Sequence, residues 1–210
     1  MRPESCSPPA ERPRGFFAQF GKPTGTLGAV VGQLMALKNG PRSRFVLSLL
    51  DLAPHHRALE IGFGPGVDLA RVAALVPEGS VAGVDHSDVM LRQARRRLKR
   101  TGHLARADLR LAGVAPLPFA DAVFERLFSI NCVQSWDNLD AATREISRVL
   151  APTGRVAIAF QPMSRGATDD SARRKAAEIA DSLGRAGLRE ISISERALRP
   201  VLCCCVLATR

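Results

Sequence analysis

The feature that most constrains this chain is a short apolar run that leads into three closely spaced glycines. Residues 58–66 read ALEIGFGPG, and a helical pattern begins directly after them. Such a sequence predicts a buried parallel strand, a tight turn and a helix whose N-terminus faces a ligand. Gly62, Gly64 and Gly66 suit the turn, because glycine accepts positive φ and lets a ligand approach the backbone. The first strand, turn and helix of a doubly wound α/β fold are therefore predicted here.

The spacing of these glycines distinguishes two classes of nucleoside cofactor. Dinucleotide-binding turns have the pattern G-x-G-x-x-G, and the third glycine of that pattern would fall on Val67. Glu60 lies two residues before the first glycine, where a carboxylate would be poorly placed beside a pyrophosphate. The carboxylate suits a cofactor with a cation near the turn, such as the ammonium and sulfonium groups of S-adenosylmethionine. A nicotinamide-dependent oxidoreductase is the disfavoured alternative.

Four segments, in the same order along the chain, resemble the class I S-adenosylmethionine-dependent methyltransferases. They are residues 60–66 (EIGFGPG), 81–87 (VAGVDHS), 116–125 (PLPFADAVFE) and 145–155 (EISRVLAPTGR). The motifs look nearest to the methyltransferase type 11 branch, which includes ubiquinone and menaquinone C-methyltransferases. The resemblance implies an enzyme that moves the methyl group of S-adenosylmethionine to a small-molecule acceptor, and a cytoplasmic location is expected from the cysteines and the lack of a membrane span. It does not indicate which acceptor, or whether carbon, nitrogen or oxygen is methylated.

The order of apolar and helical patterns predicts a Rossmann-like, doubly wound sheet of seven strands. Predicted strands at 57–61, 80–85, 108–113, 126–130 and 155–160 alternate with predicted helices at 66–75, 88–101, 139–150 and 171–186. Ser87 or Asp88 is the predicted cap of the second helix, and Asp169, Asp170 or Ser171 that of the last. Two final strand-like runs, 190–196 and 201–208, are too close for a helical crossover, so an antiparallel hairpin is predicted. A mostly parallel sheet that ends in such a hairpin is typical of the resembling family.

The residues before the first strand are predicted to form two regions. Residues 1–25 are rich in Pro, Ser and Arg and lack apolar periodicity, which predicts a disordered tail. Residues 26–56 contain two helical patterns, at 26–38 and 41–51, and the resemblance implies a helical lid over the cofactor. Residues 57–210 then form the predicted methyltransferase domain.

The resemblance implies a set of residues around the cofactor. Glu60 would accept a hydrogen bond from the ammonium group, with a salt bridge to a nearby Arg as the alternative, and Asp85 lies where a carboxylate reaches the ribose hydroxyls. The family usually has an acidic residue at the position of Val114, so this chain departs from the family beside the adenine. The predicted cofactor-binding residues are Glu60, Gly62, Phe63, Gly64, Gly66, Asp85, His86, Met90, Gly113, Val114, Ala115 and Ser129.

The loop after the fourth strand is predicted to meet the methyl acceptor. Asn131, Gln134 and Trp136 are the candidate contacts, and Trp136 either stacks on a planar acceptor or fills the core. The sequence shows no evident general base, and no metal site is predicted. Transfer of an already activated methyl group depends mainly on positioning the acceptor and excluding water, so the missing base does not argue against catalysis.

The composition limits the partners that the chain is expected to have. The net charge is +10, and Arg greatly outnumbers Lys along the whole chain. The one dense run, residues 92–100, is interpreted as a solvated helix face rather than a nucleic-acid interface. The motif N/D-P-P-Y/F expected of base-amino methylation is absent. A nucleic-acid methyltransferase and a non-catalytic S-adenosylmethionine-binding protein remain the alternatives to a small-molecule methyltransferase.

Two further features of the sequence bear on location. No apolar run approaches the ~20 residues that span a bilayer, so no membrane span is predicted. The five cysteines form no framework, and Cys203, Cys204 and Cys205 are adjacent. Neighbouring side chains on a strand point to opposite faces, which does not suit a metal cluster. They are interpreted as small buried apolar residues in a reducing compartment.

Overall fold

The computed structural model describes residues 40–210 of the chain. The predicted tail at 1–25 and the first helix of the predicted lid lie outside the described residues. The described part begins with helix α2 (Gly40–Leu49), which corresponds to the helix predicted at 41–51.

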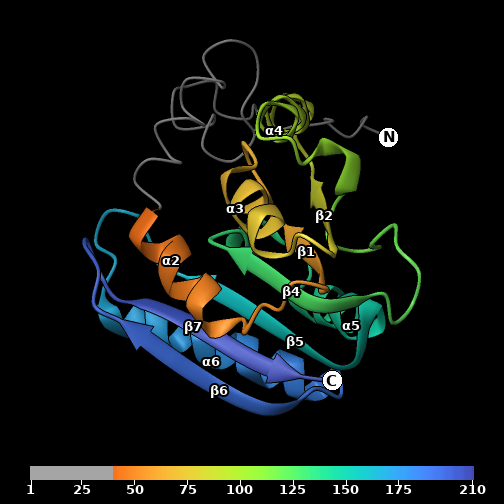
Figure 1. Cartoon of the computed structure of the whole chain (residues 1–210). Coiled ribbons are helices and arrows are strands. Elements are labelled where there is room, and N and C mark those ends of the chain that lie inside the picture. The colour runs from red at the N-terminus through yellow and green to blue at the C-terminus, as the bar shows by residue number, and fades with distance from the viewer. Residues whose placement is uncertain (1–39) are drawn as a thin grey trace, which may run out of the picture.

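A seven-stranded sheet with the order β3-β2-β1-β4-β5-β7-β6 forms the centre of the described part (Figure 1). The strands are β1 (Arg57–Ile61), β2 (Ser80–Asp85), β3 (Ala107–Leu111), β4 (Phe124–Ile130), β5 (Leu150–Phe160), β6 (Arg189–Arg196) and β7 (Cys203–Thr209). The first five strands are parallel, and β7 is antiparallel to both β5 and β6. The predicted doubly wound sheet with a terminal antiparallel hairpin is therefore confirmed. Its strand order reverses between β1 and β4, and ligands of open α/β sheets bind at such a switch point.

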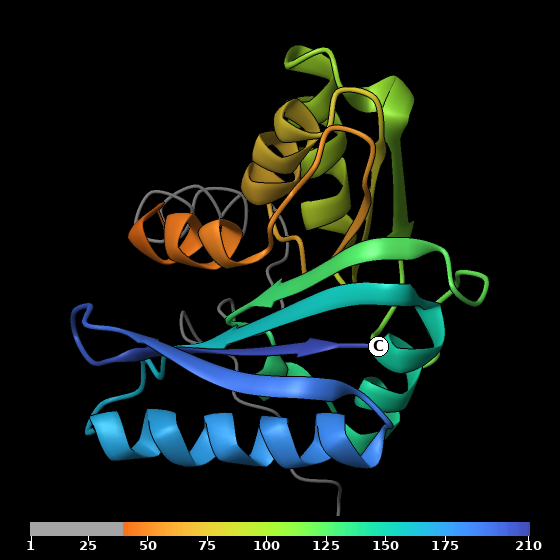
Figure 2. The ribbon, with the colours of Figure 1, turned by 60° about the horizontal axis from the view of Figure 1, so that its bottom comes forward.

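Two layers of helices cover the sheet (Figure 2). Helices α2, α3 (Val67–Leu75) and α4 (Asp88–Arg100) pack on one face, whereas α5 (Leu139–Val149) and α6 (Asp169–Arg185) pack on the other. Because the central strands are buried on both faces, they read as continuous apolar runs rather than as an alternating pattern. This burial explains why the bounds of β1 and β2 agree with the prediction.

The start of α6 and the start of β5 differ from the predictions. Helix α6 is capped by Thr168, whose side chain accepts a hydrogen bond from the backbone N–H of Ser171, while the Ser171 hydroxyl accepts one from the backbone N–H of Thr168. The predicted caps Asp169, Asp170 and Ser171 are therefore wrong, and the two aspartates lie in the first turn, where the helix dipole favours negative charge. Strand β5 begins at Leu150 rather than at residue 155, with a register shift against β4.

Two of the segments that carry the family resemblance contact each other directly. Glu145 of α5 accepts a hydrogen bond from the backbone N–H of Leu117 at 2.7 Å. Arg148 donates to the backbone oxygens of Leu117 at 2.9 Å and Phe119 at 2.8 Å, and it also pairs with Glu145 at 2.7 Å. These bonds tie the connection between β3 and β4 to α5.

The three adjacent cysteines lie on β7. Cys203, Cys204 and Cys205 are fully buried, and burial raises the pKa of the Cys203 and Cys204 thiols to about 11. Residues 40–210 contain no group of His, Cys, Asp and Glu side chains arranged to hold a metal ion. Within the same range, no helix is long and apolar enough to cross a membrane.

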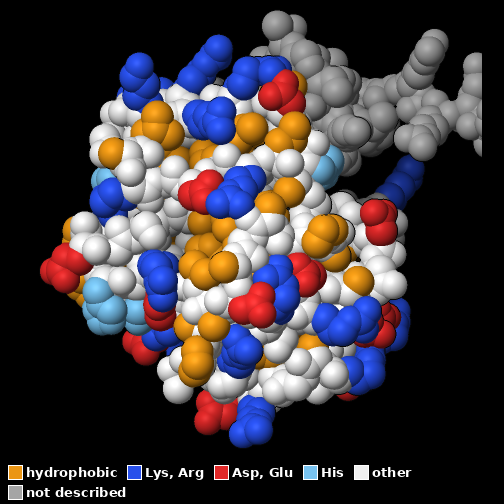
Figure 3. Space-filling model, turned by 90° about the vertical axis from the view of Figure 1, so that its right-hand side faces the viewer, with side chains coloured by type: hydrophobic (Ala, Val, Ile, Leu, Met, Phe, Trp, Pro, Cys, Tyr) orange, Lys and Arg blue, Asp and Glu red, His pale blue; other side chains and the backbone are white. Residues whose placement is uncertain are grey.

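The basic run of the sequence lies on α4. Its exposed residues are Arg92, Arg95, Arg96, Lys99 and Arg100. Figure 3 shows a group of Lys and Arg side chains at the upper end of the molecule, where Figure 1 places α4. The opposite, apolar side of α4 packs on the sheet through Met90, Leu91, Ala94 and Leu98. The basic side chains are therefore those that a helix with one buried stripe turns to solvent.

Candidate functional site

A cavity of about 500 Å³ opens at the carboxyl ends of the central strands. Four stretches of chain line it: the end of β1, the end of β2, the loop at 112–115 after β3, and the segment at 132–141 that follows β4. Gly62, Asp85, His86, Gly113, Val114, Ala115 and Trp136 are the sequence-predicted site residues on its wall. The structure thus brings seven predicted residues from four separate loops together at the switch point of the sheet.

The glycine turn has the backbone conformation that its sequence predicts. Gly62, Gly64 and Gly66 have φ angles of 78°, 51° and 72°, in the left-handed region that side chains disfavour. A Cβ atom on Gly62 would lie 2.3 Å from the sulfur of Cys132. Gly66 is the N-cap of α3. Only glycine at position 62 therefore lets the backbone of the turn border the cavity while Cys132 packs behind it.

Glu60 lies buried beneath the turn, with 3% of its surface exposed. Burial raises its pKa well above the usual range, and the neighbouring charges of Asp68 and Asp85 add to this effect. Its Oε2 atom has no hydrogen-bond partner within residues 40–210. The charge of Arg71 acts on Glu60 in the opposite direction, but Arg71 pairs with Asp68 at 2.7 Å. A buried carboxylate oxygen without a donor costs free energy, and a cationic or hydrogen-bond-donating ligand group would remove that cost.

Asp85 ends β2 on the wall of the cavity, with 7% of its surface exposed. Its Oδ2 accepts a hydrogen bond from the backbone N–H of Gly64, and its Oδ1 accepts one from the backbone N–H of Ser87, both at 2.9 Å. Burial raises the pKa of this carboxyl group, while the two backbone hydrogen bonds act in the opposite direction. Helix α4 is capped by Ser87, as predicted, so Asp85 is not needed as its cap.

Six predicted cofactor residues are not on the cavity wall: Glu60 lies beneath the turn, Gly64 lies within it, and the other four support it. Phe63 is buried against Gly83, where a Cβ atom would lie 2.6 Å from the Phe63 ring. Met90 belongs to the core between α4 and the sheet. Gly66 faces Ala94 of α4, and a Cβ atom on it would lie 2.7 Å from the Ala94 Cβ atom. The hydroxyl of Ser129 donates to the backbone oxygen of Ile61 at 2.9 Å.

Of the three predicted acceptor contacts, only Trp136 lies on the cavity wall. Trp136 lines the cavity, and its indole Nε1 is buried without a hydrogen-bond partner among the described residues. The side chain of Asn131 accepts a hydrogen bond from the backbone N–H of Gln161 at 2.7 Å, and Gln134 donates to the backbone oxygen of Asn131. The amides of Asn131 and Gln134 are therefore engaged in holding the loop after β4.

Helix α2 connects this edge of the sheet to the glycine turn. Ser43 donates to Oδ2 of Asp68 at 2.7 Å, in the first turn of α3. Arg42 is buried and donates to the side-chain oxygen of Gln161 at 3.0 and 2.7 Å, at the carboxyl end of β5. Neither contact was predicted from the sequence, because the residues that form them belong to no motif. That residues 26–56 act as a lid stays a prediction.

Four polar residues of the cavity wall were not predicted from the sequence. Cys132, Ser135, Asp137 and Asn138 stand on the cavity wall, and all four belong to the loop between β4 and α5. The loop itself was assigned to the acceptor from the sequence. The loop leads directly into α5, whose N-cap Asn138 lines the same cavity as residues 112–115, and this position before a helix is the signal that could have indicated these residues.

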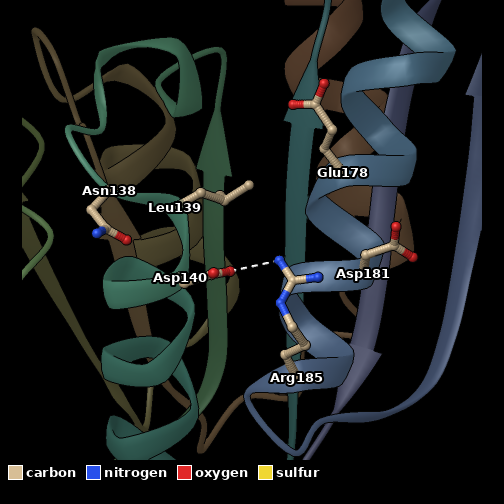
Figure 4. A pocket seen from close by; sticks show the side chains of 6 residues that line it. All are labelled: Asn138, Leu139, Asp140, Glu178, Asp181 and Arg185. Atoms are coloured by element: carbon tan, nitrogen blue, oxygen red, sulfur yellow. Dashed lines mark hydrogen bonds and ion pairs between the residues drawn. The ribbon is translucent and has the colours of Figure 1, made fainter.

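A second pocket, of about 410 Å³, lies between α5 and α6 (Figure 4). Asp140 and Arg185 form an ion pair across it at 2.7 Å, and the Ser182 hydroxyl donates to the same Asp140 oxygen at 2.6 Å. The pocket is open and polar, and it contains neither a glycine turn nor a buried unpaired carboxylate. The cavity at the switch point is therefore the candidate functional site.

Comparisons with known proteins agree with this assignment. Residues 58–154 match the family model described as "Methyltransferase domain". An uncharacterised methyltransferase of Bacillus subtilis is 25% identical over 86% of this chain and 98% of its own length. A ubiquinone/menaquinone biosynthesis C-methyltransferase of Geotalea daltonii is 28% identical over 55% of this chain, which spans about half of that protein's length.

The fold agrees with solved structures as well. An S-adenosylmethionine-dependent methyltransferase from Aquifex aeolicus superposes with a TM-score of 0.69 at 19% identity, over 84% of this chain and 96% of that one. The family match covers the glycine turn, Asp85, the loop after β3 and the whole of α5. Residues 58–154 therefore match a methyltransferase domain, and residues 40–210 share the fold of S-adenosylmethionine-dependent methyltransferases.

Proposed function

We propose that this chain transfers the methyl group of S-adenosylmethionine to a small-molecule acceptor and that S-adenosylhomocysteine is released. The observation that carries the proposal is the pairing of two buried carboxylates with one glycine turn. Glu60 lies under the turn with an unpaired oxygen, and Asp85 faces the cavity while holding the backbone of Gly64. A ligand with a cation at one end and neighbouring hydroxyl groups farther along matches this arrangement.

The residues of the turn and of β2 would bind and orient the cofactor. The carboxylate of Glu60 would accept from the ammonium group, and Asp85 would use its remaining lone pairs on the ribose hydroxyls. Gly62 and Gly64 would keep the backbone close to the methionine part of the cofactor. His86, Gly113, Val114 and Ala115 would border the nucleoside. When bound, S-adenosylmethionine supplies a methyl group that is already activated by the sulfonium.

The protein's own contribution to the chemistry would be positioning and exclusion of water. The transfer is an in-line displacement, so holding the acceptor atom in line with the methyl group lowers the barrier. Trp136 would border the acceptor from the loop after β4, and α2 would cover the same edge of the sheet through Arg42 and Ser43. This proposal needs no assigned general base, because an acceptor that is nucleophilic when bound reacts without one.

The small-molecule acceptor is supported by the cavity and by the relatives. The walls are formed by short loops at one edge of the sheet, and the cavity holds about 500 Å³. Among the relatives, the Geotalea daltonii protein is named for ubiquinone/menaquinone C-methylation. A reduced quinone or another electron-rich ring is therefore the first class of acceptor to examine.

The proposal is tested by following the methyl group. The purified protein would be incubated with methyl-labelled S-adenosylmethionine and a bacterial extract that has been separated into small molecules, nucleic acid and protein. Label is expected in the small-molecule fraction, with loss of transfer in the Asp85→Ala variant. Label confined to nuclease-sensitive material would contradict the proposal and favour a nucleic-acid methyltransferase. Tight cofactor binding without transfer in any fraction would favour a non-catalytic binding protein.

A further inference from the structure

The part of the cavity that follows β3 lacks a side chain able to accept a hydrogen bond. Its residues are Ala112, Gly113, Val114 and Ala115, all on the wall. The adenine of S-adenosylmethionine carries an exocyclic amino group, which is a hydrogen-bond donor. A donor that leaves water without finding an acceptor costs free energy. If the cofactor binds here as proposed, a side-chain acceptor for this amino group comes from another part of the wall.

The loop before α5 forms the neighbouring part of the same wall. Ser135 already donates to the backbone oxygen of Cys132 at 2.6 Å, and Asn138 accepts from the backbone N–H of Ala141 at 2.9 Å as the cap of α5. Between them lies Asp137, whose carboxylate makes no hydrogen bond or ion pair with any residue of 40–210. Asp137 is therefore the one unengaged carboxylate on the described wall.

The other carboxylates near this wall have partners. Asp108 of β3 pairs with Arg110 at 2.7 Å. Asp140, in the first turn of α5, pairs with Ser182 and Arg185 and lines the pocket of Figure 4 instead. Asp85 holds the backbone of the glycine turn and is assigned to the ribose. None of these three can take the place of an acid after β3.

We propose that Asp137 accepts a hydrogen bond from the amino group of the cofactor's adenine. It would thereby take the role of the acidic residue that the family usually has at the position of Val114. This assignment rests on the proposed function. The carboxylate then belongs to the loop after β4 instead of the loop after β3, and both loops border the same cavity. Asp137 is thus a residue that determines specificity for adenine, and Val114 provides an apolar contact beside it.

The test compares two ligands, S-adenosylhomocysteine and its 6-deamino analogue, in which hydrogen replaces the amino group. Affinities are measured by calorimetric titration of the full chain. Asp137 is exposed in the structure. Wild-type protein is expected to bind S-adenosylhomocysteine about tenfold more tightly than the analogue, as one hydrogen bond to a charged acceptor allows. In Asp137→Ala, binding of S-adenosylhomocysteine should weaken about tenfold, whereas binding of the analogue should not change.

Two variants control for charge and for folding. Asp181→Ala removes an exposed carboxylate from the pocket of Figure 4, and it should bind both ligands as the wild type does. The double variant Val114→Asp, Asp137→Ala returns an acid to the loop after β3 and should recover the preference for adenine. Equal discrimination by wild type and Asp137→Ala would overturn the assignment. Failure of the wild-type protein to bind either ligand would instead overturn the proposed function, and the assignment with it.

Discussion

The backbone N–H of Gly64 donates to Oδ2 of Asp85 at 2.9 Å, so the acid that ends the second strand holds the turn that follows the first strand. The other carboxylate oxygen of Asp85 accepts from the backbone N–H of Ser87, the cap of α4. One side chain therefore fixes the relative positions of two loops that border the cavity. Its remaining lone pairs are available to a ligand.

Replacing Asp85 with Ala should weaken binding of S-adenosylmethionine by at least about tenfold, because ligand and turn both lose a charged acceptor. The measurement is calorimetric titration, with circular dichroism to verify the fold. Asp88→Ala is the matched control, since Asp88 is exposed in the first turn of α4 and its one partner among residues 40–210 is Arg92. Unchanged affinity in Asp85→Ala would show that this carboxylate does not bind the cofactor.

Glu60 should make stability depend on pH. Its pKa is raised in the folded protein, so the folded state keeps the proton after the unfolded state has lost it above about pH 4.3. The free energy of unfolding should then decrease as the pH rises from there through the raised pKa. In Glu60→Gln this contribution is absent, so the variant should gain stability relative to the wild type between pH 5 and pH 8.

Glu60→Gln should weaken cofactor binding, although it should stabilise the protein without ligand. The ionised form of Glu60 would pair with the ammonium group, so wild-type affinity should increase with pH over the range in which Glu60 loses its proton. Glu60→Gln should bind more weakly and without this dependence. Thermal unfolding and titration at pH 5, 6, 7 and 8 measure both effects. Parallel pH profiles for the two proteins would contradict the assignment of the raised pKa to Glu60.

Gly62 should tolerate no side chain, for two separable reasons. Its φ of 78° is nearly the same as the 77° of Gly102, but a Cβ atom on Gly62 would meet Cys132, whereas one on Gly102 would meet nothing within 4 Å. Gly102→Ala should therefore cost only the backbone strain, about 1 kcal/mol of unfolding free energy. Gly62→Ala should cost more, by about 1–3 kcal/mol. Equal losses in a denaturation series would show that Cys132 moves aside freely.

Arg148 should contribute to stability through geometry as well as charge. It donates to two backbone oxygens of the connection between β3 and β4 and pairs with Glu145. Lysine cannot make these bonds together, so Arg148→Lys should lower the unfolding free energy by about 2 kcal/mol. Arg173→Lys is the control, because Arg173 forms an exposed pair with Glu195 and its replacement should change the unfolding free energy far less. Similar losses in both variants would contradict this role of Arg148.

The sequence predicted the fold well where burial determines it. Strands β1 and β2 were predicted with the observed bounds, because turn residues border each apolar run. The predicted cap of α6 was wrong because Thr168, Asp169, Asp170 and Ser171 can all cap a helix. Which of them does so depends on where the chain leaves β5. The terminal hairpin followed from loop length alone, since no helix fits between β6 and β7.

The candidate site was predicted in its position but only partly in its side chains. Neighbours on a turn point in different directions, so Gly62 borders the cavity while Phe63 packs in the core. Asn131 was chosen as a polar residue near the acceptor, yet its amide binds the backbone of Gln161, which lies 30 residues away in sequence. Such pairing across the sheet leaves no periodic signal. The positions of Cys132 and Asp137 on the cavity wall depend on how the loop after β4 folds back toward the glycine turn, which no sequence motif predicts.

The most direct test of the central claim is calorimetric titration of the full chain with S-adenosylmethionine, S-adenosylhomocysteine and NAD. The buried carboxylate under a G-x-G-x-G turn should accept the cationic cofactor and its product with micromolar affinity, and it should reject the pyrophosphate of NAD. Binding of the first two ligands without binding of NAD is the predicted result. Binding of NAD, or failure of the protein to bind S-adenosylmethionine and S-adenosylhomocysteine, would contradict the account of this site.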